Sequence, residues 1–337
     1  MDTILEIKGL KTYFKTDGAV IPAVDGVDFH VEKGKTIGIV GESGCGKSVT
    51  SLSIMRLLKC PPGKIVDGQI ILDGRDLLKL SDREMRDIRG KEVSMIFQEP
   101  MTSLNPCFTI GNQLIEVLRA HSNISKSEAK KQALEMLESV SISRPDEIIS
   151  SYPYELSGGM RQRVMIAMAM LCNPKVLIAD EPTTALDVTI QIQILTLMKK
   201  MQEAKGTAIV FITHDLGVIA EVADHVAVMY AGKVVEEASC EEIFNNPKHP
   251  YTIGLHDSTP KIEKSTPRLH TIYGMVPNLA NKIEGCAFKT RCKDAMPICG
   301  DKAPEITDIE KNHKVRCWKY CKESGCDADA LRRIICQ

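Results

Sequence analysis

The chain has 337 residues, of which 43% are hydrophobic and 26% are charged, as expected for a folded globular protein large enough for two domains. Its 43 basic residues are balanced by 44 acidic ones, so the overall charge gives no support to nucleic-acid binding. The N-terminal residues show neither the basic patch nor the apolar run of a secretory signal, and no apolar run is long enough to cross a bilayer. We therefore expect a protein of a reducing compartment that serves a membrane, if at all, from its surface.

The first part of the chain is predicted to consist mainly of strands. Residues 4–7 and 23–31 are expected to be strands, the second because apolar and polar residues alternate. Residues 36–40 form a short apolar run that predicts a buried strand. A glycine-rich turn follows, then a helix over 49–58, and then an edge strand with a turn over 68–78.

The glycine-rich turn, residues 41–48, fits the pattern G-x-x-x-x-G-K-[ST] and lies between a predicted strand and a predicted helix. Its glycines allow backbone N–H groups to wrap phosphate oxygens, Lys47 can reach the β- and γ-phosphates, and the Ser48 hydroxyl can ligate Mg²⁺. The alternative is a simple glycine-rich turn before a helix, which would not need Lys and Ser at these offsets. The predicted ATP-binding residues here are Gly41, Ser43, Gly44, Cys45, Gly46, Lys47, Ser48 and Val49, with Cys45 at a free position of the motif.

The middle of the chain, residues 101–154, is predicted to be helical. Ser125 and Glu128 can form a capping box at the start of one helix. The apolar stripe behind them is predicted to pack in a core and consists of Ala133, Leu134, Leu137 and Val140. Two apolar strands follow, over 176–179 and 208–212. Strands that alternate with helices predict an α/β protein with a mainly parallel sheet covered on both faces.

The strand over 176–179 leads directly into Asp180 and Glu181. A carboxylate at the end of a buried strand can hold Mg²⁺, and the neighbouring side chain points in another direction, where it can orient an attacking water. An isolated acidic pair would more often be a solvated turn. Together with the phosphate loop, it predicts ATP hydrolysis with Glu181 as the catalytic residue.

A second anion-binding helix start lies at Ser157, Gly158 and Gly159, in front of a predicted helix over 160–171. A chain with one phosphate loop has no evident use for another phosphate-binding helix start. The segment resembles the signature motif of ATP-binding cassette (ABC) proteins, which in that family completes the site of a partner cassette. Met160 replaces the more common Gln of the motif.

The remaining ABC motifs follow in the order of the family. Gln98 resembles the Q-loop residue that senses Mg²⁺ and the membrane subunit, Asp187 resembles the D-loop aspartate, and His214 resembles the switch histidine that contacts the γ-phosphate. Tyr13 or Phe14 would stack on adenine, with Phe14 preferred. The resemblance covers residues 3–240. It implies a P-loop ABC ATPase fold with a mainly parallel core sheet, an antiparallel β subdomain and a helical subdomain at about 101–160, all within a domain of residues 1–245.

Several segments resemble one branch of this family, the ATP-binding subunits of oligopeptide, dipeptide and nickel importers. They are residues 41–48, 97–106, 160–168, 178–189, 246–252, 276–279, 285–288 and 291–292. The resemblance implies a dimer with a second ABC ATPase subunit, distinct or identical, peripheral on the cytoplasmic side of the membrane. Permease subunits and an extracytoplasmic peptide-binding protein would be its partners. The choice among dipeptide, oligopeptide and nickel stays open.

Two functions other than transport are less compatible with the sequence. A soluble ABC ATPase of chromosome maintenance would carry long coiled coils between the phosphate loop and the signature, and one of translation would usually carry two cassettes. The chain has neither feature. A nucleotide-regulated binding subunit without turnover would need a degraded site, whereas Glu181 and His214 are both present.

After Asn245 prolines recur, periodicity fades and cysteines accumulate, which predicts a second, smaller, loop-rich domain over 246–337. Four cysteines there are separated by five, six and seventeen residues, unlike a zinc ribbon: Cys286, Cys292, Cys299 and Cys317. Spacing alone leaves an iron–sulfur cluster, Zn²⁺ and plain buried cysteines open. The branch resemblance implies [4Fe-4S] ligands with a structural part, where Cys321 can substitute for Cys317. Cys326 and Cys336 have no counterpart in the branch.

Overall fold

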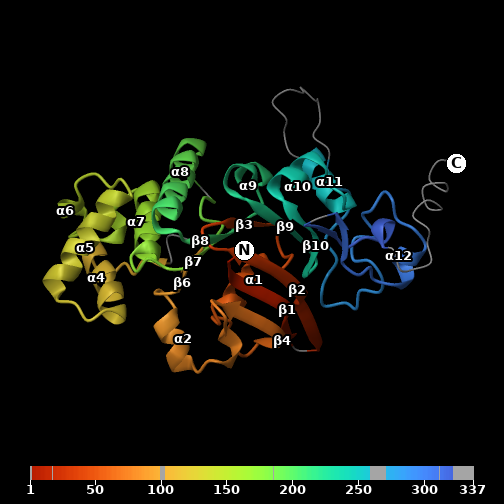
Figure 1. The fold of residues 1–337 in the computed structure, drawn as a ribbon, viewed down its shortest axis with the longest axis horizontal. Helices are drawn as coiled ribbons and strands as arrows, with labels where there is room; N and C mark the ends of the chain where they lie inside the picture. Colours follow the sequence, from red (N-terminus) through yellow and green to blue (C-terminus); the bar gives the residue numbers. More distant parts are fainter. Residues whose placement is uncertain are drawn as a thin grey trace. The chain divides into compact units, whose positions relative to one another are not determined.

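The computed structural model describes residues 2–16, 18–98, 103–184, 186–258, 271–310 and 312–321 (Figure 1). The chain divides into two compact units. The first unit contains residues 2–6, 30–36 and 70–212, and the second contains residues 7–29, 37–69 and the described residues from 213 on. Each unit is described by itself.

An antiparallel sheet has the strand order β2-β1-β4-β5, and its longer strands contribute residues to both units. Its strands are β1 (Thr3–Thr16), β2 (Ala19–Glu32), β4 (Gly63–Leu72) and β5 (Arg75–Asp76). The first two are longer than predicted, and in β1 fully buried residues such as Leu10 lie beyond the predicted range. The predicted edge strand and turn over 68–78 is confirmed in part: the edge is the short β5 within this range, whereas residues 68–72 belong to β4, which lies between β1 and β5.

In the first unit, a parallel three-stranded group carries the acidic pair. It consists of β6 (Val93–Ile96), β7 (Val176–Asp180) and β8 (Ala208–Thr213), with β7 in the middle. All residues of the three strands are buried, which confirms the two predicted apolar strands. Parallel pairing brings the carboxyl ends of the strands to one edge, where Asp180 lies opposite Ile212.

The same unit contains the predicted helical region. The helices of this unit are α2 (Asp82–Ile88), α4 (Ile110–His121), α5 (Lys126–Ser139), α6 (Pro145–Ile148), α7 (Gly158–Met170) and α8 (Val188–Lys205), of which α4, α5 and α6 lie in the predicted region. The helices α4, α5 and α7 pack on one another (Figure 1). Ala133 and Leu137 are fully buried on α5, as predicted. Ser125 caps this helix by accepting from Glu128 N at 3.1 Å, while the Glu128 carboxylate accepts from Gln132 instead of closing the expected box.

In the second unit, the strand before the phosphate loop, β3 (Thr36–Val40), pairs in parallel with β9 (His225–Tyr230). β9 turns through Ala231 and Gly232 into β10 (Lys233–Ser239), and this hairpin was missed from the sequence. The other elements of the unit are α1 (Lys47–Ile54), α9 (Leu216–Val222), α10 (Cys240–Asn245), α11 (Pro250–Asp257), α12 (Ile298–Asp301), β11 (Thr307–Glu310) and β12 (His313–Val315).

Two features of this unit differ from the sequence-based expectation. The helix predicted over 49–58 is wrong at both ends, since α1 begins at Lys47 and ends at Ile54, before Arg56 takes a left-handed conformation with φ 49°. The loop-rich C-terminal segment is not free of regular structure, because β12 pairs with β10 and extends the sheet. No helix in the described part of the chain is both long and apolar enough to span a membrane.

Candidate active site

The phosphate loop leaves β3 through Gly41 and enters α1 through Gly46. Both residues have positive φ, 156° and 106°. A Cβ on Gly41 would lie 2.2 Å from the Met229 carbonyl oxygen, and a Cβ on Gly46 would lie 2.4 Å from the carbonyl oxygen of Ala23. Only glycine therefore fits at these two positions, because backbone of other strands closes in on the loop.

Lys47 is the first residue of α1, and its side chain folds back over the loop. It is 5% exposed, and its ammonium donates to the carbonyl oxygens of Gly41 at 2.7 Å and Glu42 at 3.1 Å. The ammonium also lies 3.8 Å from the Cys45 sulfur. The predicted counter-charge for phosphate is thus held at the positive end of a helix, with Ser48 next to it in the first turn.

Cys45 has a packing role that the motif did not predict. It is 1% exposed, and its carbonyl oxygen accepts from Gly232 N at 3.0 Å, which fixes the loop to the turn between β9 and β10. Burial raises the pKa of its thiol. Val49 follows on α1 and is half-buried.

The two candidate adenine-binding aromatics point to opposite faces of β1. The Tyr13 hydroxyl donates to Asp25 at 2.9 Å, and Asp25 is also paired with Lys233. This side of Tyr13 lines a cavity of about 490 Å³. The Phe14 ring packs instead against Gly63, where an added Cβ would lie 2.9 Å from the ring. The stacking role of either residue stays a prediction.

The first unit brings Gln98 and Glu181 together. Asp180 is 3% exposed at the end of β7, and Glu181 follows with a left-handed φ of 48°. One Glu181 carboxylate oxygen accepts from Gln98 Nε2 at 2.9 Å and from Thr184 Oγ1 at 3.0 Å. A non-glycine residue with this backbone is held there by its surroundings, and such strain is concentrated at functional sites.

The signature segment also lies in the first unit. Ser157 caps α7, and its hydroxyl accepts from Met160 N at 3.4 Å. Ser157 and Gly158 are exposed, and a Cβ on Gly158 would meet only open space. Gly159 faces Ile190, because a Cβ on this glycine would lie 3.2 Å from the Ile190 side chain. The helix start is therefore accessible to a second molecule.

Gln162 is a residue of this region for which no role was predicted from the sequence. It is 1% exposed and donates to the carbonyl oxygen of Pro182, the residue after Glu181. This bond fixes α7 to the segment that holds the acidic pair. Its signal in the sequence is the run R-Q-R at residues 161–163, which directly follows the signature segment.

The two remaining motif residues stand at helix starts. Asp187 caps α8 and accepts from Ile190 N at 2.9 Å, whereas Ala185 of the same motif lies outside the described residues. His214 follows β8 and is exposed, and the next residue, Asp215, caps α9 by accepting from Gly217 N at 2.8 Å. His214 and the phosphate loop lie in the second unit, whereas Gln98, the acidic pair, the signature segment and Asp187 lie in the first.

The four predicted cysteine ligands are free thiols in the second unit. Cys299 is buried, and the other three are half-buried. Cys286 N donates to the Cys299 carbonyl oxygen at 2.8 Å. Burial, and then the charges of the other three thiols, raise the pKa of Cys317 to about 12, and burial raises the pKa of Cys292 to about 11. At neutral pH these two thiols are therefore protonated in the absence of a metal. Cys321 is directed elsewhere, 3.6 Å from Thr307 Oγ1.

Another group with ligand atoms close together consists of Glu242, Glu310 and His313, whose oxygen and nitrogen atoms lie within 4.8 Å of one another. The Lys248 ammonium lies 3.9 Å from Glu310. His313 also donates or accepts through Nε2 at 2.8 Å from Glu236. Lys248 thus compensates part of the negative charge of this group.

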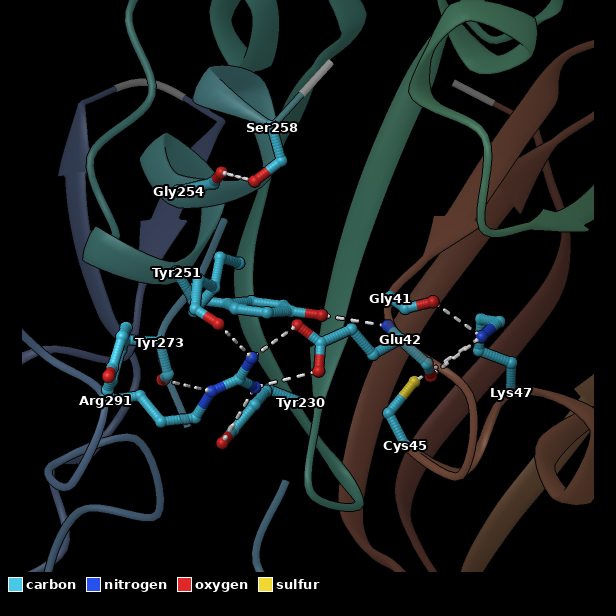
Figure 2. Close-up of polar contacts among 11 residues, drawn as sticks. Gly41, Glu42, Cys45, Lys47, Tyr230, Tyr251, Gly254, Ser258, Tyr273 and Arg291 are labelled. Atoms are coloured by element: carbon cyan, nitrogen blue, oxygen red, sulfur yellow. Dashed lines mark hydrogen bonds and ion pairs between the residues drawn. The ribbon is translucent and has the colours of Figure 1, made fainter. Parts of the chain in front are cut away.

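The phosphate loop has contacts with C-terminal residues that the sequence did not predict. Arg291 binds both carboxylate oxygens of Glu42, at 2.8 and 3.0 Å, and the Tyr251 hydroxyl accepts from Glu42 N at 2.9 Å (Figure 2). Both residues stand in segments that resemble the importer branch, but nothing in the sequence pairs them with position 42. The contact of Arg291 joins residues 249 positions apart.

Comparisons with known proteins identify the family of the chain. The chain matches the family described as "ABC transporter" over residues 24–184 and "Oligopeptide/dipeptide transporter, C-terminal region" over residues 235–299. A solved dimeric ATP-binding cassette in a post-hydrolysis state, bound to ADP and Pi, matches with a TM-score of 0.63 and 29% identity. The match covers 70% of this chain and 98% of that one. The class is therefore the ABC-type ATPases, and the predicted P-loop ABC ATPase fold is confirmed.

Among the relatives, the oligopeptide transport ATP-binding protein AppD of Bacillus subtilis is 54% identical over 325 residues, which are 96% of this chain and 99% of AppD. The dipeptide transport ATP-binding protein DppD of the same organism is 51% identical over 318 residues, 94% of this chain and 95% of DppD. The chain belongs to the family of oligopeptide and dipeptide transporter ATP-binding proteins, as the sequence motifs predicted.

Proposed function

We propose that the chain is the ATP-hydrolysing subunit of an importer of dipeptides or oligopeptides. The observation that carries this proposal is the match, over nearly the whole of both chains, to ATP-binding proteins named for oligopeptide and dipeptide transport. The matches name peptides, so peptide import is favoured over nickel import. The intact phosphate loop and acidic pair support a subunit that turns over, not one that only binds nucleotide.

In this proposal the phosphate loop holds the nucleotide. Lys47 neutralises the β- and γ-phosphates, backbone N–H groups of residues 41–48 bind their oxygens, and Tyr13 or Phe14 stacks on adenine. Ser48, Asp180 and Gln98 would hold Mg²⁺, which supplies charge neutralisation on the phosphates when it is bound.

Glu181 orients the attacking water and accepts its proton, a role typically worth about 10²–10⁴-fold in rate. The bond from Gln98 to the Glu181 carboxylate supports this assignment, because it links the water-orienting residue to a predicted Mg²⁺ ligand. His214 would contact the γ-phosphate, and Asp187 would act at the boundary with the partner cassette.

The signature segment would serve the ATP of a second ABC ATPase subunit, distinct or identical. Support comes from the exposed start of α7, where Gly158 leaves open space for a phosphate group. The dimer would bind permease subunits on the cytoplasmic side of the membrane and receive peptides through an extracytoplasmic binding protein. We also propose a nucleotide-binding domain over 1–245 and a C-terminal domain over 246–337.

For the C-terminal cysteines we propose a structural [4Fe-4S] cluster, with Zn²⁺ as the alternative. Four free thiols, each buried or half-buried, provide a suitable set of ligands. A tetrahedral Zn²⁺ with bonds of about 2.3 Å needs sulfurs about 3.8 Å apart. A [4Fe-4S] cluster separates its cysteine sulfurs more widely than a single Zn²⁺ does, so the choice between the two is left to the metal analysis. Iron and acid-labile sulfide in anaerobically purified protein would support it, and stoichiometric zinc without sulfide would exclude it.

The function is tested by reconstitution with the cognate permease and binding protein in vesicles. Uptake of labelled dipeptide and oligopeptide, and of ⁶³Ni²⁺ as the competing cargo, is measured with and without ATP. We expect ATP-dependent uptake of peptide that Glu181→Gln abolishes. Uptake that continues with Glu181→Gln, or that transports nickel and no peptide, would contradict the proposal.

A further inference from the structure

Arg291 and Tyr251 stand outside the cassette motifs but bind the second residue of the phosphate loop. We infer that they are positioning residues of the nucleotide site, and that Arg291 keeps the loop fit for an anion by neutralising Glu42. ATP affinity would then depend on the C-terminal segment of the same chain. This inference rests on the proposed ATP-binding function and deepens it.

Arg291 is held rigidly for this purpose. Its side chain is 5% exposed, and besides the two bonds to Glu42 its Nε donates to the Tyr273 carbonyl oxygen at 3.2 Å. The guanidinium carbon lies 5.8 Å from the centre of the Tyr230 ring and 6.0 Å from that of Phe288. A bidentate Arg–carboxylate pair fixed by further contacts has a defined direction as well as charge (Figure 2).

Glu42 is fixed on all of its polar groups. Arg291 binds its carboxylate, Tyr251 accepts its N–H, and Lys47 donates to its carbonyl oxygen (Figure 2). Tyr251 is itself fully buried against Tyr230, with ring centres 4.7 Å apart. The backbone at this position is therefore set by residues from the C-terminal segment before any phosphate arrives. A loop that is ordered in advance loses less entropy on binding.

The charge of Glu42 makes the pair necessary. A carboxylate in a loop that must bind triphosphate repels its ligand unless a cation is close to it. Lys47 does not serve this purpose, because it is bound to carbonyl oxygens and is the counter-charge for phosphate itself. Removal of Arg291 alone would leave an unpaired, half-buried negative charge in the loop. Removal of both charges would leave no unpaired charge in the loop. Replacing a charged pair by neutral groups costs less free energy than removing one partner only.

The double variant distinguishes two roles of Arg291: neutralising the charge of Glu42, or only holding the two segments together. If Arg291 only holds the segments together, Glu42→Gln does not repair the damage done by Arg291→Ala, and the double variant binds no better than Arg291→Ala. If Arg291 neutralises Glu42, Glu42→Gln suppresses that damage. The suppression is therefore the readout that a structural role would not give.

The experiment measures the Kd of MgATP by isothermal titration calorimetry, and KM and kcat of ATP hydrolysis, on the full chain. We expect Arg291→Ala to raise Kd about 10- to 100-fold, with KM rising more than kcat falls. Glu42→Gln alone should bind within a few-fold of wild type, and Arg291→Ala with Glu42→Gln should regain most of the loss. Lys293→Ala, an exposed position two residues away, is the matched control and should bind as wild type does.

Tyr251→Phe keeps the buried ring and removes only the hydroxyl that accepts a hydrogen bond from Glu42 N–H. It therefore tests whether the C-terminal segment positions the phosphate loop, even if Arg291→Ala does not fold. It should raise Kd several-fold at an unchanged thermal midpoint. Wild-type affinity in both Arg291→Ala and Tyr251→Phe overturns the inference, and so does a double variant as weak as Arg291→Ala. Wild-type protein that binds no MgATP would instead refute the proposed function.

Discussion

His249 is a buried histidine at the start of α11, and it should make the stability of the C-terminal segment depend on pH. It is 2% exposed, its Nδ1 accepts from Tyr251 N at 3.0 Å, and burial lowers its pKa from 6.5 to about 4. The charge of Glu236 opposes this shift, and Arg316 acts in both directions. The folded chain therefore keeps His249 neutral in a range of pH where the unfolded chain protonates it.

The sign and size of the effect follow from linkage. Because the folded pKa lies below the unfolded one, stability is complete above pH 6.5 and falls as the pH drops towards 4. With 6.5 for the unfolded and about 4 for the folded chain, the free energy of unfolding falls by about 2 kcal/mol between pH 7.5 and pH 5. Well below pH 4, the free energy of unfolding has fallen by about 3 kcal/mol in total, and this contribution falls no further.

The assay uses urea unfolding followed by tryptophan fluorescence. Trp318 is the chain's one tryptophan, is 6% exposed and donates to the Lys302 carbonyl oxygen at 2.8 Å, so it reports on the C-terminal segment itself. The test variant is His249→Asn, since Asn can cap α11 in the same way but does not titrate. His30→Asn, at an exposed position of β2, is the control.

Between pH 7.5 and pH 5 wild type and His30→Asn should lose about 2 kcal/mol more than His249→Asn loses. The loss of the ring's packing on Phe288 lowers the stability of His249→Asn at every pH, so the slopes are compared and not the values. Parallel pH profiles for wild type and His249→Asn would refute the reasoning, because they would show that His249 is protonated equally in the folded and unfolded chain.

Three further tests concern the nucleotide site. Glu181→Gln should lower the ATPase rate about 10²–10⁴-fold and retain ATP binding, because only the water-orienting carboxylate is lost; normal steady-state turnover contradicts that role. Lys47→Ala should weaken ATP binding by removing the phosphate counter-charge, and an unchanged Kd in calorimetry would end that assignment. Gly41→Ala should lower Tm and abolish binding, since its Cβ would lie 2.2 Å from the Met229 carbonyl oxygen, whereas Gly158→Ala should keep the wild-type Tm, since its Cβ meets open space. Equal Tm values for the two variants would contradict the difference in packing.

The elements predicted best from the sequence are those whose residues are apolar throughout. The strand β3 and the apolar parts of β7 and β8 were found almost to the residue, because every position in them is buried. The phosphate loop was found because its chemistry requires fixed residue types at fixed offsets. Capping and local turns were found only in part, since α1 ends where Arg56 takes an unexpected left-handed conformation.

The strand β10 was missed because two glutamates interrupt its hydrophobic pattern. Glu236 is completely buried and Glu237 is 2% exposed, yet neither is an unpaired charge. Glu236 accepts from the backbone N–H groups of Lys248 and His249, and His225 and Lys314 lie beside Glu237. Hydrogen bonds and cations outweigh burial here and lower the pKa of both carboxyl groups. No periodicity in the sequence can predict a buried acid whose partners are supplied from elsewhere in the chain.

Glu42 and Glu236 are both acids whose partners come from a distant part of the chain, and their contacts cross the predicted boundary after residue 245. Each is an acid of the first 245 residues whose cation or donors come from beyond that position: Arg291 for Glu42, and Lys248, His249 and His313 for Glu236. A boundary drawn from the loss of periodicity therefore separates charges that the fold pairs. Removal of one partner leaves the other unpaired, so the two acids and their partners beyond position 245 stabilise each other. All of these residues lie in one compact unit together with the phosphate loop.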